Sequence, residues 1–342
     1  LNYVKSSRFA RQCPINVRYA FNLFSPHGLM HAALAELDEK LEFTPKLMEA
    51  LWQCTLCGGC DLRCKRNLDV EVLQVIENLR QRCVEQGHVL PAHKMLADNA
   101  LKSHNIYGAE PAQRLAWMPA GTRPTPGAEV LFFVGDPLSY RQPDLALSTV
   151  KLLGQAGIPF SVLENEWSSG HELFATGQMA AAKEMAEHNY KAIVDSGART
   201  VIASDAECYK TLKVDYPKLM EKSTGDLPFK VLHITEYADQ LLKDGKLKFN
   251  RPVPMKVTYH DPCNLGRLAE PWYHWEPHYE LPNKAIGKTW RRGDKGVYQE
   301  PRDVLKAIKG LELVEMERAK DNAWCCGYGG GVGTAFPAFA AW

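Results

Sequence analysis

The apolar positions in the first hundred residues recur at helical spacing. After Ser25, apolar side chains follow at intervals of three and four residues as far as Leu41, as in a helix with a capped start. A second run of this kind is bounded by Asp69, which is placed to cap a helix, and by Gly87, which is placed to end one. The pattern therefore predicts a mainly helical region over residues 1–103.

The pattern changes near residue 128, where short continuous apolar runs begin to alternate with helical patterns. The runs of strand type cover residues 130–135, 158–163, 199–204, 255–260 and 311–316, and the helical patterns between them cover 142–155, 176–195 and 301–309. Strands that alternate with helices indicate parallel α/β units.

These patterns predict an α+β protein of several domains. The boundaries follow the changes in pattern: a helical domain over 1–103, a linker rich in proline and glycine over 104–127, and two α/β domains over 128–250 and 251–342. A length of 342 residues is sufficient for this number of domains.

The two α/β domains read as copies of one another. In the first, a strand precedes GDP (135–137), WSSG (167–170) and SDAEC (204–208); in the second, a strand precedes HDPC (260–263) and WCCG (324–327). In the first copy, the places where a cysteine-bearing copy would hold ligands are occupied by Asp136, Ser168, Ser169, Asp205 and Cys208. Each place follows a strand or lies in a loop, which is where α/β folds bind ligands.

Composition and charge exclude several classes of partner. The net charge of +1 gives no reason to expect nucleic acid, and no apolar run approaches the ~18 residues that a bilayer span requires. Ten cysteines are many for a chain of this kind, and Cys54, Cys57, Cys60 and Cys64 fall within eleven residues. They are too close together to form a disulfide scaffold, so metal ligation is the favoured interpretation.

The spacing C-x2-C-x2-C-x3-C favours an iron–sulfur cluster. Three thiolates at this spacing can surround one face of a four-iron cluster, and Gly58-Gly59 allows the backbone to turn closely around it. A zinc ribbon normally has two separated C-x2-C pairs, so zinc and redox-active thiols are the weaker alternatives.

The fourth ligand of this cluster is predicted to be Cys13. Counting back from Cys13-Pro14 by the same spacing reaches Phe9, Ser6 and Tyr3, as if an earlier motif had lost its first three cysteines. Since the fourth cysteine of such a motif ligates the other cluster in two-cluster ferredoxins, Cys13 would complete the set of Cys54, Cys57 and Cys60. The rival assignment makes Cys64 the fourth ligand.

Cys263, Cys325 and Cys326 form a second candidate site. Adjacent cysteines followed by GYGGG indicate a tight loop around a bulky group. A phosphate loop is excluded as an explanation of the glycines, because its sequence signature is not present. The alternative is a glycine-rich turn with two incidental thiols. Asp136, Asp205 and Cys208 in the first copy give a further, weaker alternative, a site for a hard metal ion.

The whole chain resembles iron–sulfur subunits that combine a two-cluster ferredoxin domain with two cysteine-rich CCG domains, such as those of heterodisulfide reductase and glycolate oxidase. The resemblance rests on SPHG (25–28), CTLCGGC (54–60), AECYKTLKVDYPKL (206–219), HDPCNLGR (260–267), EPR (300–302) and WCCGYGGG (324–331). By this resemblance, one ferredoxin motif and the first CCG domain are degenerate, and the first CCG domain holds no cluster. The closing cysteines of the second domain would lie about twenty residues beyond Trp342, so we expect the natural chain to continue.

The resemblance implies an oxidoreductase subunit that carries electrons between one ferredoxin-type 4Fe–4S cluster and one CCG cluster, of the kind that is non-cubane in the heterodisulfide reductases. Cys325 and Cys326 would be catalytic if the CCG cluster cleaves or forms disulfides. The expected partners are other redox subunits: a flavoprotein, a ferredoxin-like protein or a membrane quinone or cytochrome subunit. The expected location is the cytoplasm, with membrane association only through a partner. The alternatives are a structural subunit with a single conducting cluster and a zinc-stabilised binding protein.

Overall fold

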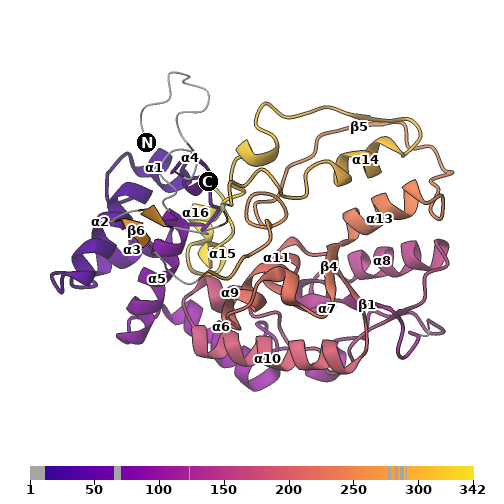
Figure 1. Ribbon diagram of the computed structural model, residues 1–342, viewed down its shortest axis with the longest axis horizontal. Helices are drawn as coiled ribbons and strands as arrows, with labels where there is room; N and C mark the ends of the chain where they lie inside the picture. Colours follow the sequence, from indigo (N-terminus) through magenta and orange to yellow (C-terminus); the bar gives the residue numbers. More distant parts are fainter. Residues whose placement is uncertain are drawn as a thin grey trace.

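The structure, a computed structural model, has a helical part, an α/β part and a C-terminal segment that returns to the helices (Figure 1). It describes residues 12–64, 71–122, 124–275 and 291–342, and between these last two ranges only 279–281, 284–285 and 289.

The N-terminal part is helical, as the apolar spacing predicts. Its helices are α1 (Pro14–Tyr19), α2 (Pro26–Leu37), α3 (Pro45–Trp52), α4 (Asp61–Cys64), α5 (Val72–Glu85) and α6 (Pro91–Ser103). The predicted start of α2 is confirmed, because the backbone N–H of Gly28 donates to Ser25 Oγ at 3.1 Å. The end of α5 near Gly87 is also confirmed, and this glycine has a φ of +83°. Asp69, its predicted cap, lies outside the described residues.

The first α/β domain contains a parallel sheet in the order β2-β1-β3-β4. The strands are β1 (Val130–Phe133), β2 (Phe160–Ser161), β3 (Thr200–Ala203) and β4 (Lys230–His233), and β1 pairs with β3 from Val130↔Thr200 to Phe133↔Ala203. The helices around them are α7 (Gly135–Tyr140), α8 (Pro143–Gln155), α9 (His171–Ala175), α10 (Met179–Asp195), α11 (Ala206–Lys210), α12 (Tyr216–Leu219) and α13 (Ile234–Lys243). Strand β4 was not predicted from the sequence, because its only signal there is the short apolar run at Val231 and Leu232.

The second α/β domain repeats the first pairing of this sheet. Strands β5 (Met255–Val257) and β8 (Leu311–Leu313) pair in parallel as β1 and β2 do. Between them in sequence lie an antiparallel hairpin of β6 (Tyr279–Leu281) and β7 (Lys284–Ala285), and then α14 (Glu300–Lys306). Two short helices follow β8: α15 (Val332–Ala335) and α16 (Pro337–Ala340). The predicted strands are present but shorter than expected.

Residues 104–127, which we expected to act as a linker, pack against the first α/β domain. Arg114 and Trp117 are 3% and 8% exposed, and the Trp117 ring meets Phe132 of β1 edge-on at 6.2 Å. The proline- and glycine-rich composition predicts irregular backbone, but it carries no information about which side chains are buried.

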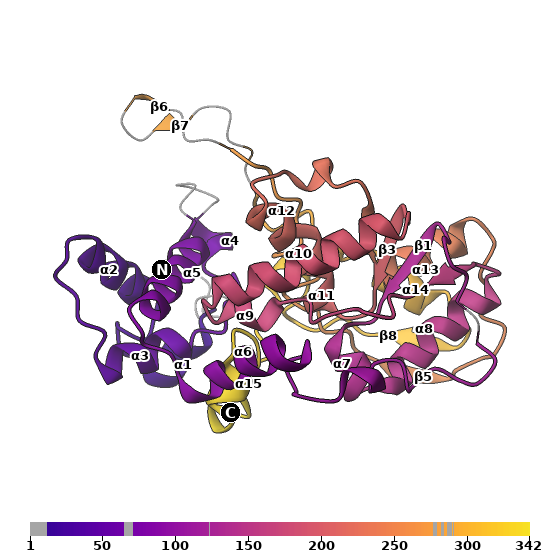
Figure 2. The same cartoon turned by 90° about the horizontal axis from the view of Figure 1, so that it is seen from below.

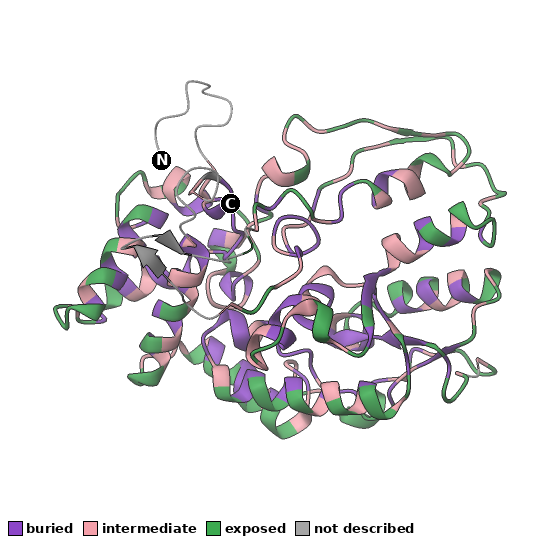
Figure 3. Cartoon of the chain, viewed as in Figure 1, coloured by how far each residue is buried: buried purple, intermediate pink, exposed green. Residues whose placement is uncertain are grey.

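The C-terminal segment packs into the helical part. Val332 and Phe339 belong to the same buried cluster as Leu29, Leu51 and Ile76, and Figure 2 shows α15 beside α6. Figure 3 shows buried residues along the strands and in the loops where the parts meet. This packing brings together the two cysteine-bearing loops.

Candidate metal centre

The loop after α3 and the loop before α15 lie against each other. Cys325 Sγ donates to Thr55 Oγ1 at 3.1 Å. A Cβ on Gly330 would lie 2.8 Å from the Cys54 carbonyl oxygen, and Gly330 has a φ of +67°. Only glycine allows this approach, which explains the glycine run after the cysteine pair.

The structure brings Cys13 to the thiols of Cys54, Cys57 and Cys60. Burial raises the pKa of Cys13 strongly, and the charges of Cys54 and Cys57 raise it further; burial and these same neighbours raise the pKa of Cys60. Burial and Asp61 raise the pKa of Cys64, on which none of these cysteines acts. All ten cysteines are free of disulfides.

The second set, Cys263, Cys325 and Cys326, also comes together and adjoins the first. Interactions with Cys326 and Cys57 raise the pKa of Cys325, and the interaction with Cys325 lowers the pKa of Cys57. The interaction with Cys325, together with the Tyr328 backbone N–H, lowers the pKa of Cys326 to about 5, although burial acts in the opposite direction. Burial raises the pKa of Cys263 to about 12, and Cys57 and Cys326 are among the charges acting on it. Cys326 is exposed, whereas Cys325 is buried.

The two sets provide the donors that iron–sulfur clusters need. Soft thiolates are the ligands that such clusters take, and these thiols are gathered without disulfides. Across the described part of the chain, no three His, Cys, Asp or Glu side chains are placed around a single metal ion.

Two buried arginines that the sequence analysis did not identify as functional tie the cysteine loops together. Arg80, on α5, donates to the carbonyl oxygens of Cys54 and Gly330, and Arg267 donates to those of Cys57 and Ala323. Each arginine therefore joins the first cysteine loop to the second. The sequence signal for Arg267 is its place in HDPCNLGR, but nothing near Arg80 marks it.

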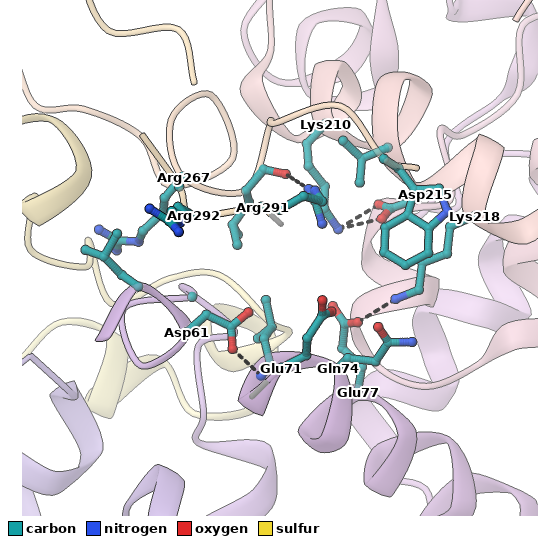
Figure 4. Close-up of a pocket in the computed structure, with 17 residues that line it drawn as sticks. Asp61, Glu71, Gln74, Glu77, Lys210, Asp215, Lys218, Arg267, Arg291 and Arg292 are labelled. Atoms are coloured by element: carbon teal, nitrogen blue, oxygen red, sulfur yellow. Dashed lines mark hydrogen bonds and ion pairs between the residues drawn. The ribbon is translucent and has the colours of Figure 1, made fainter. Parts of the chain in front are cut away.

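A pocket of about 590 Å³, counting the solvent at its mouth, lies beside this junction (Figure 4). Gly58, α5, α11 and the segment after Arg267 line it. Its lysines are paired with carboxylates: Lys210 with Asp215 at 2.7 Å and Lys218 with Glu77 at 2.9 Å. The Lys218–Glu77 pair joins the helical part to the first α/β domain, and neither lysine is left as a ready anion receptor.

The first α/β domain has an ion-paired triad after β1. Asp136 lies 2.6 Å from Arg114, and Arg114 lies 2.9 Å from Glu166. The second copy repeats this arrangement, because Arg302 contacts Asp261 at 2.7 Å and Glu315 at 2.6 Å.

The triads correct the predicted correspondence between the copies. Asp136 matches Asp261, not Cys263, and Leu138 stands in the place of Cys263. Leu138 is 1% exposed. The weaker prediction of a hard-metal site is also wrong, because Asp136 is occupied by Arg114 and by the backbone N–H of Ile106.

The WSSG loop is held by hydrogen bonds. The Asn189 amide donates to the Ser168 carbonyl at 2.9 Å, and the Tyr216 hydroxyl donates to the Ser169 carbonyl at 3.2 Å. Trp167 is stacked between His104 and His188, at centroid distances of 3.8 and 3.7 Å. These hydrogen bonds and the ring stacking hold the loop in place.

His93 links the second cysteine loop to α6. It is fully buried, and its Nε2–H donates to the Gly331 carbonyl at 2.9 Å. Burial lowers the pKa of His93 to about 4. Because this folded-state pKa lies below the unfolded value of about 6.5, the contribution of neutral His93 is complete above pH 6.5 and is lost as the pH falls toward 4.

We expect acidification from pH 7 to pH 5 to cost about 2 kcal/mol through His93 alone. The measurement is urea unfolding of the wild type and of His93→Gln at both pH values. Glutamine can donate to the same carbonyl but does not titrate, so the variant should lose less stability than the wild type. Equal losses in the two proteins would contradict this role.

The comparisons with known proteins agree with this geometry. The cysteine-rich CCG domain model matches residues 130–213 and 257–341, which are the two α/β copies. One subunit of the dihydromethanophenazine:CoB–CoM heterodisulfide reductase of Methanosarcina barkeri is 34% identical over 324 residues, which cover 93% of this chain and 69% of that protein. The chain belongs to the CCG-domain family of iron–sulfur oxidoreductase subunits.

Other members of this family differ in the activities that their names describe. One subunit of the fumarate reductase (CoM/CoB) of Methanothermobacter marburgensis is 31% identical, over 96% of this chain and 58% of its own length. The EtfAB:quinone oxidoreductase of Syntrophomonas wolfei is 28% identical, over 86% of this chain and 38% of its own length. No solved structure matches the chain. Among the described residues, no helix has the length and apolar character needed to cross a bilayer.

Proposed function

We propose that this chain is an electron-transfer subunit with two adjacent iron–sulfur clusters. Cys13, Cys54, Cys57 and Cys60 would ligate a ferredoxin-type 4Fe–4S cluster, with Cys64 as the rival fourth ligand. Cys263, Cys325 and Cys326 would ligate the CCG cluster. The clusters would supply one-electron transfer, and the protein would supply thiolates, a dry shell and hydrogen bonds.

The contact between the two cysteine loops is the observation that carries this proposal. Cys325 Sγ donates at 3.1 Å to Oγ1 of Thr55, the residue that follows Cys54, so the two proposed clusters would lie close together and electrons would pass directly between them. The exposure of Cys326, beside buried Cys325, supports an outer face at which a thiol, a disulfide or a partner could exchange electrons. Disulfide chemistry of the heterodisulfide reductase kind is the favoured reaction at that face.

The partners would be other redox subunits: a flavoprotein, a ferredoxin-like protein or a membrane quinone or cytochrome subunit. Several relatives are named as subunits of larger oxidoreductases, which supports this expectation. We place the chain in the cytoplasm, where contact with a membrane would run through a partner.

A second candidate function is a structural subunit with a single conducting cluster. The first CCG copy supports it, because buried Leu138 stands in the place of Cys263 and serines stand in the places of the cysteine pair. A zinc-stabilised binding protein remains the alternative of another class.

Iron and acid-labile sulfide analysis of anaerobically purified protein tests all three. We expect about eight irons per chain with matching sulfide if both clusters form, and about four if only the ferredoxin-type cluster forms. Zinc without sulfide would refute electron transfer.

A further inference from the structure

Four arginines are buried among the described residues, and they fall into two kinds. Arg114 and Arg302, remote from the proposed ligands in sequence, each contact two carboxylates. Arg80 and Arg267, beside the cysteine loops, are 0% and 8% exposed and form no ion pair within the described chain. The hydrogen-bond acceptors of the second kind are neutral carbonyl oxygens.

Arg80 donates to the carbonyls of Leu51, Cys54, Ala175 and Gly330. Its flat face lies 4.8 Å from the centre of the Trp52 ring, and its Nε–H finds no hydrogen-bond partner among the described residues. The carboxylates whose charge reaches Arg80 are Glu77 and Glu172. Glu77 is bonded to Lys218 at 2.9 Å, and neither carboxylate contacts the guanidinium.

Arg267 lies between the two sets of cysteines. It donates to the carbonyls of Cys57, Asp321 and Ala323, the last being two residues before Cys325. The groups whose negative charge acts on it are Cys57, Cys263 and Cys325, followed by Tyr298. Two of these cysteines belong to the second set and one to the first.

A buried charge without an opposite charge is strongly unfavourable, which is why Arg114 and Arg302 are paired. Hydrogen bonds to neutral carbonyls satisfy donors but do not neutralise charge. Thiolates that ligate a cluster carry negative charge, and those of the two cysteine loops would lie beside Arg80 and Arg267. Positive charge near a cluster favours its reduced, more negative state, since charge and hydrogen bonding set cluster potentials.

We infer that Arg80 and Arg267 are the buried counter-charges of the two proposed clusters and raise their reduction potentials. Arg80 acts on the cluster held by Cys54, and Arg267 acts on both clusters and couples them. This inference rests on the proposed function. Both are positioning residues: they hold the cysteine loops in place and set the reduction potentials of the clusters, and they take no direct part in a reaction with substrate.

The test is a redox titration of the anaerobically purified full chain, followed by electron paramagnetic resonance. Arg267→Gln should lower the midpoint potentials of both clusters, each by at least the tenfold change in equilibrium that corresponds to 59 mV for one electron. Arg80→Gln should lower only the potential of the ferredoxin-type cluster. Arg267→Lys and Arg80→Lys, which keep the charge, should shift the potentials by less than half as much.

The outcomes separate this inference from the proposed function. Wild-type protein without iron and sulfide would overturn the proposed function. Clusters present at unchanged potentials in both glutamine variants would overturn the inference and leave the function standing. If a glutamine variant holds no cluster, loading of the matching lysine variant supports the charge requirement. A lysine variant that also fails to load, with the circular dichroism of the wild type, overturns it.

Discussion

Replacing Cys13 with serine is expected to abolish or convert the ferredoxin-type cluster signal in electron paramagnetic resonance. Cys13 precedes α1, far in sequence from the loop at residues 54–60, yet it is partly buried and close enough to Cys54 and Cys57 for their charges to raise its pKa. If it is the fourth ligand, its loss leaves three thiolates, and we expect about four irons to fall to three or fewer. The measurement is iron content with the reduced-state spectrum.

Cys64→Ser is the matched control for this change. Cys64 lies one turn beyond Cys60 in α4, where its backbone N–H donates to the Cys60 carbonyl at 3.2 Å. By contrast, Cys54 and Cys57 are among the charges that raise the pKa of both Cys13 and Cys60. We expect Cys64→Ser to keep its iron and its spectrum. Loss of the signal in Cys64→Ser with retention in Cys13→Ser would show that the ligand assignment is wrong.

Removal of the Arg114 side chain should give the largest loss of stability away from the cysteines. Arg114→Ala leaves Asp136 and Glu166 buried without their cation, and breaking a buried ion pair in this way costs about 3–5 kcal/mol. That is a large share of the 5–15 kcal/mol by which folded domains are typically stable. The measurement is the midpoint of urea unfolding, followed by the near-ultraviolet circular dichroism of the tryptophans.

Arg199→Ala is the control for this prediction. Arg199 precedes β3 and is exposed, and it lies 3.8 Å from an exposed Glu129. An exposed pair contributes about 0–1 kcal/mol, so this change should barely move the midpoint. A loss in Arg114→Ala no greater than that in Arg199→Ala would show that the triad does not stabilise the domain.

Local patterns in the sequence predicted much of the fold. The cap and spacing of α2, the end of α5 near Gly87, and the alternation of strands and helices after residue 128 each depend on residues close together in the chain. The lengths of the strands and the presence of β4 could not be predicted, because a run of two or three apolar residues is too short to show a period. The packing of residues 104–127 was also hidden, since burial of Arg114 and Trp117 depends on partners elsewhere in the chain.

The repeat was recognised from the sequence, but the correspondence of its positions was partly wrong. Both copies were recognised from WSSG and WCCG, but Asp136 was matched with a cysteine position. The ion pairs Asp136–Arg114 and Asp261–Arg302 show the true equivalence, and Arg114 precedes its copy while Arg302 lies inside the other. A correspondence set by partners so differently placed along the chain cannot be read from spacing alone.

The sequence by itself determined the chemistry available to this protein: two groups of cysteines, their spacing, the glycines that let loops turn around a cluster, and a duplicated α/β unit with one degenerate copy. These follow from residue type and local order. The tertiary structure alone decided that the two groups adjoin and that Arg80 and Arg267 each join the first cysteine loop to the second. Those relations arise because the C-terminal segment packs into the N-terminal helices, a contact between residues some 250 positions apart that no local periodicity encodes.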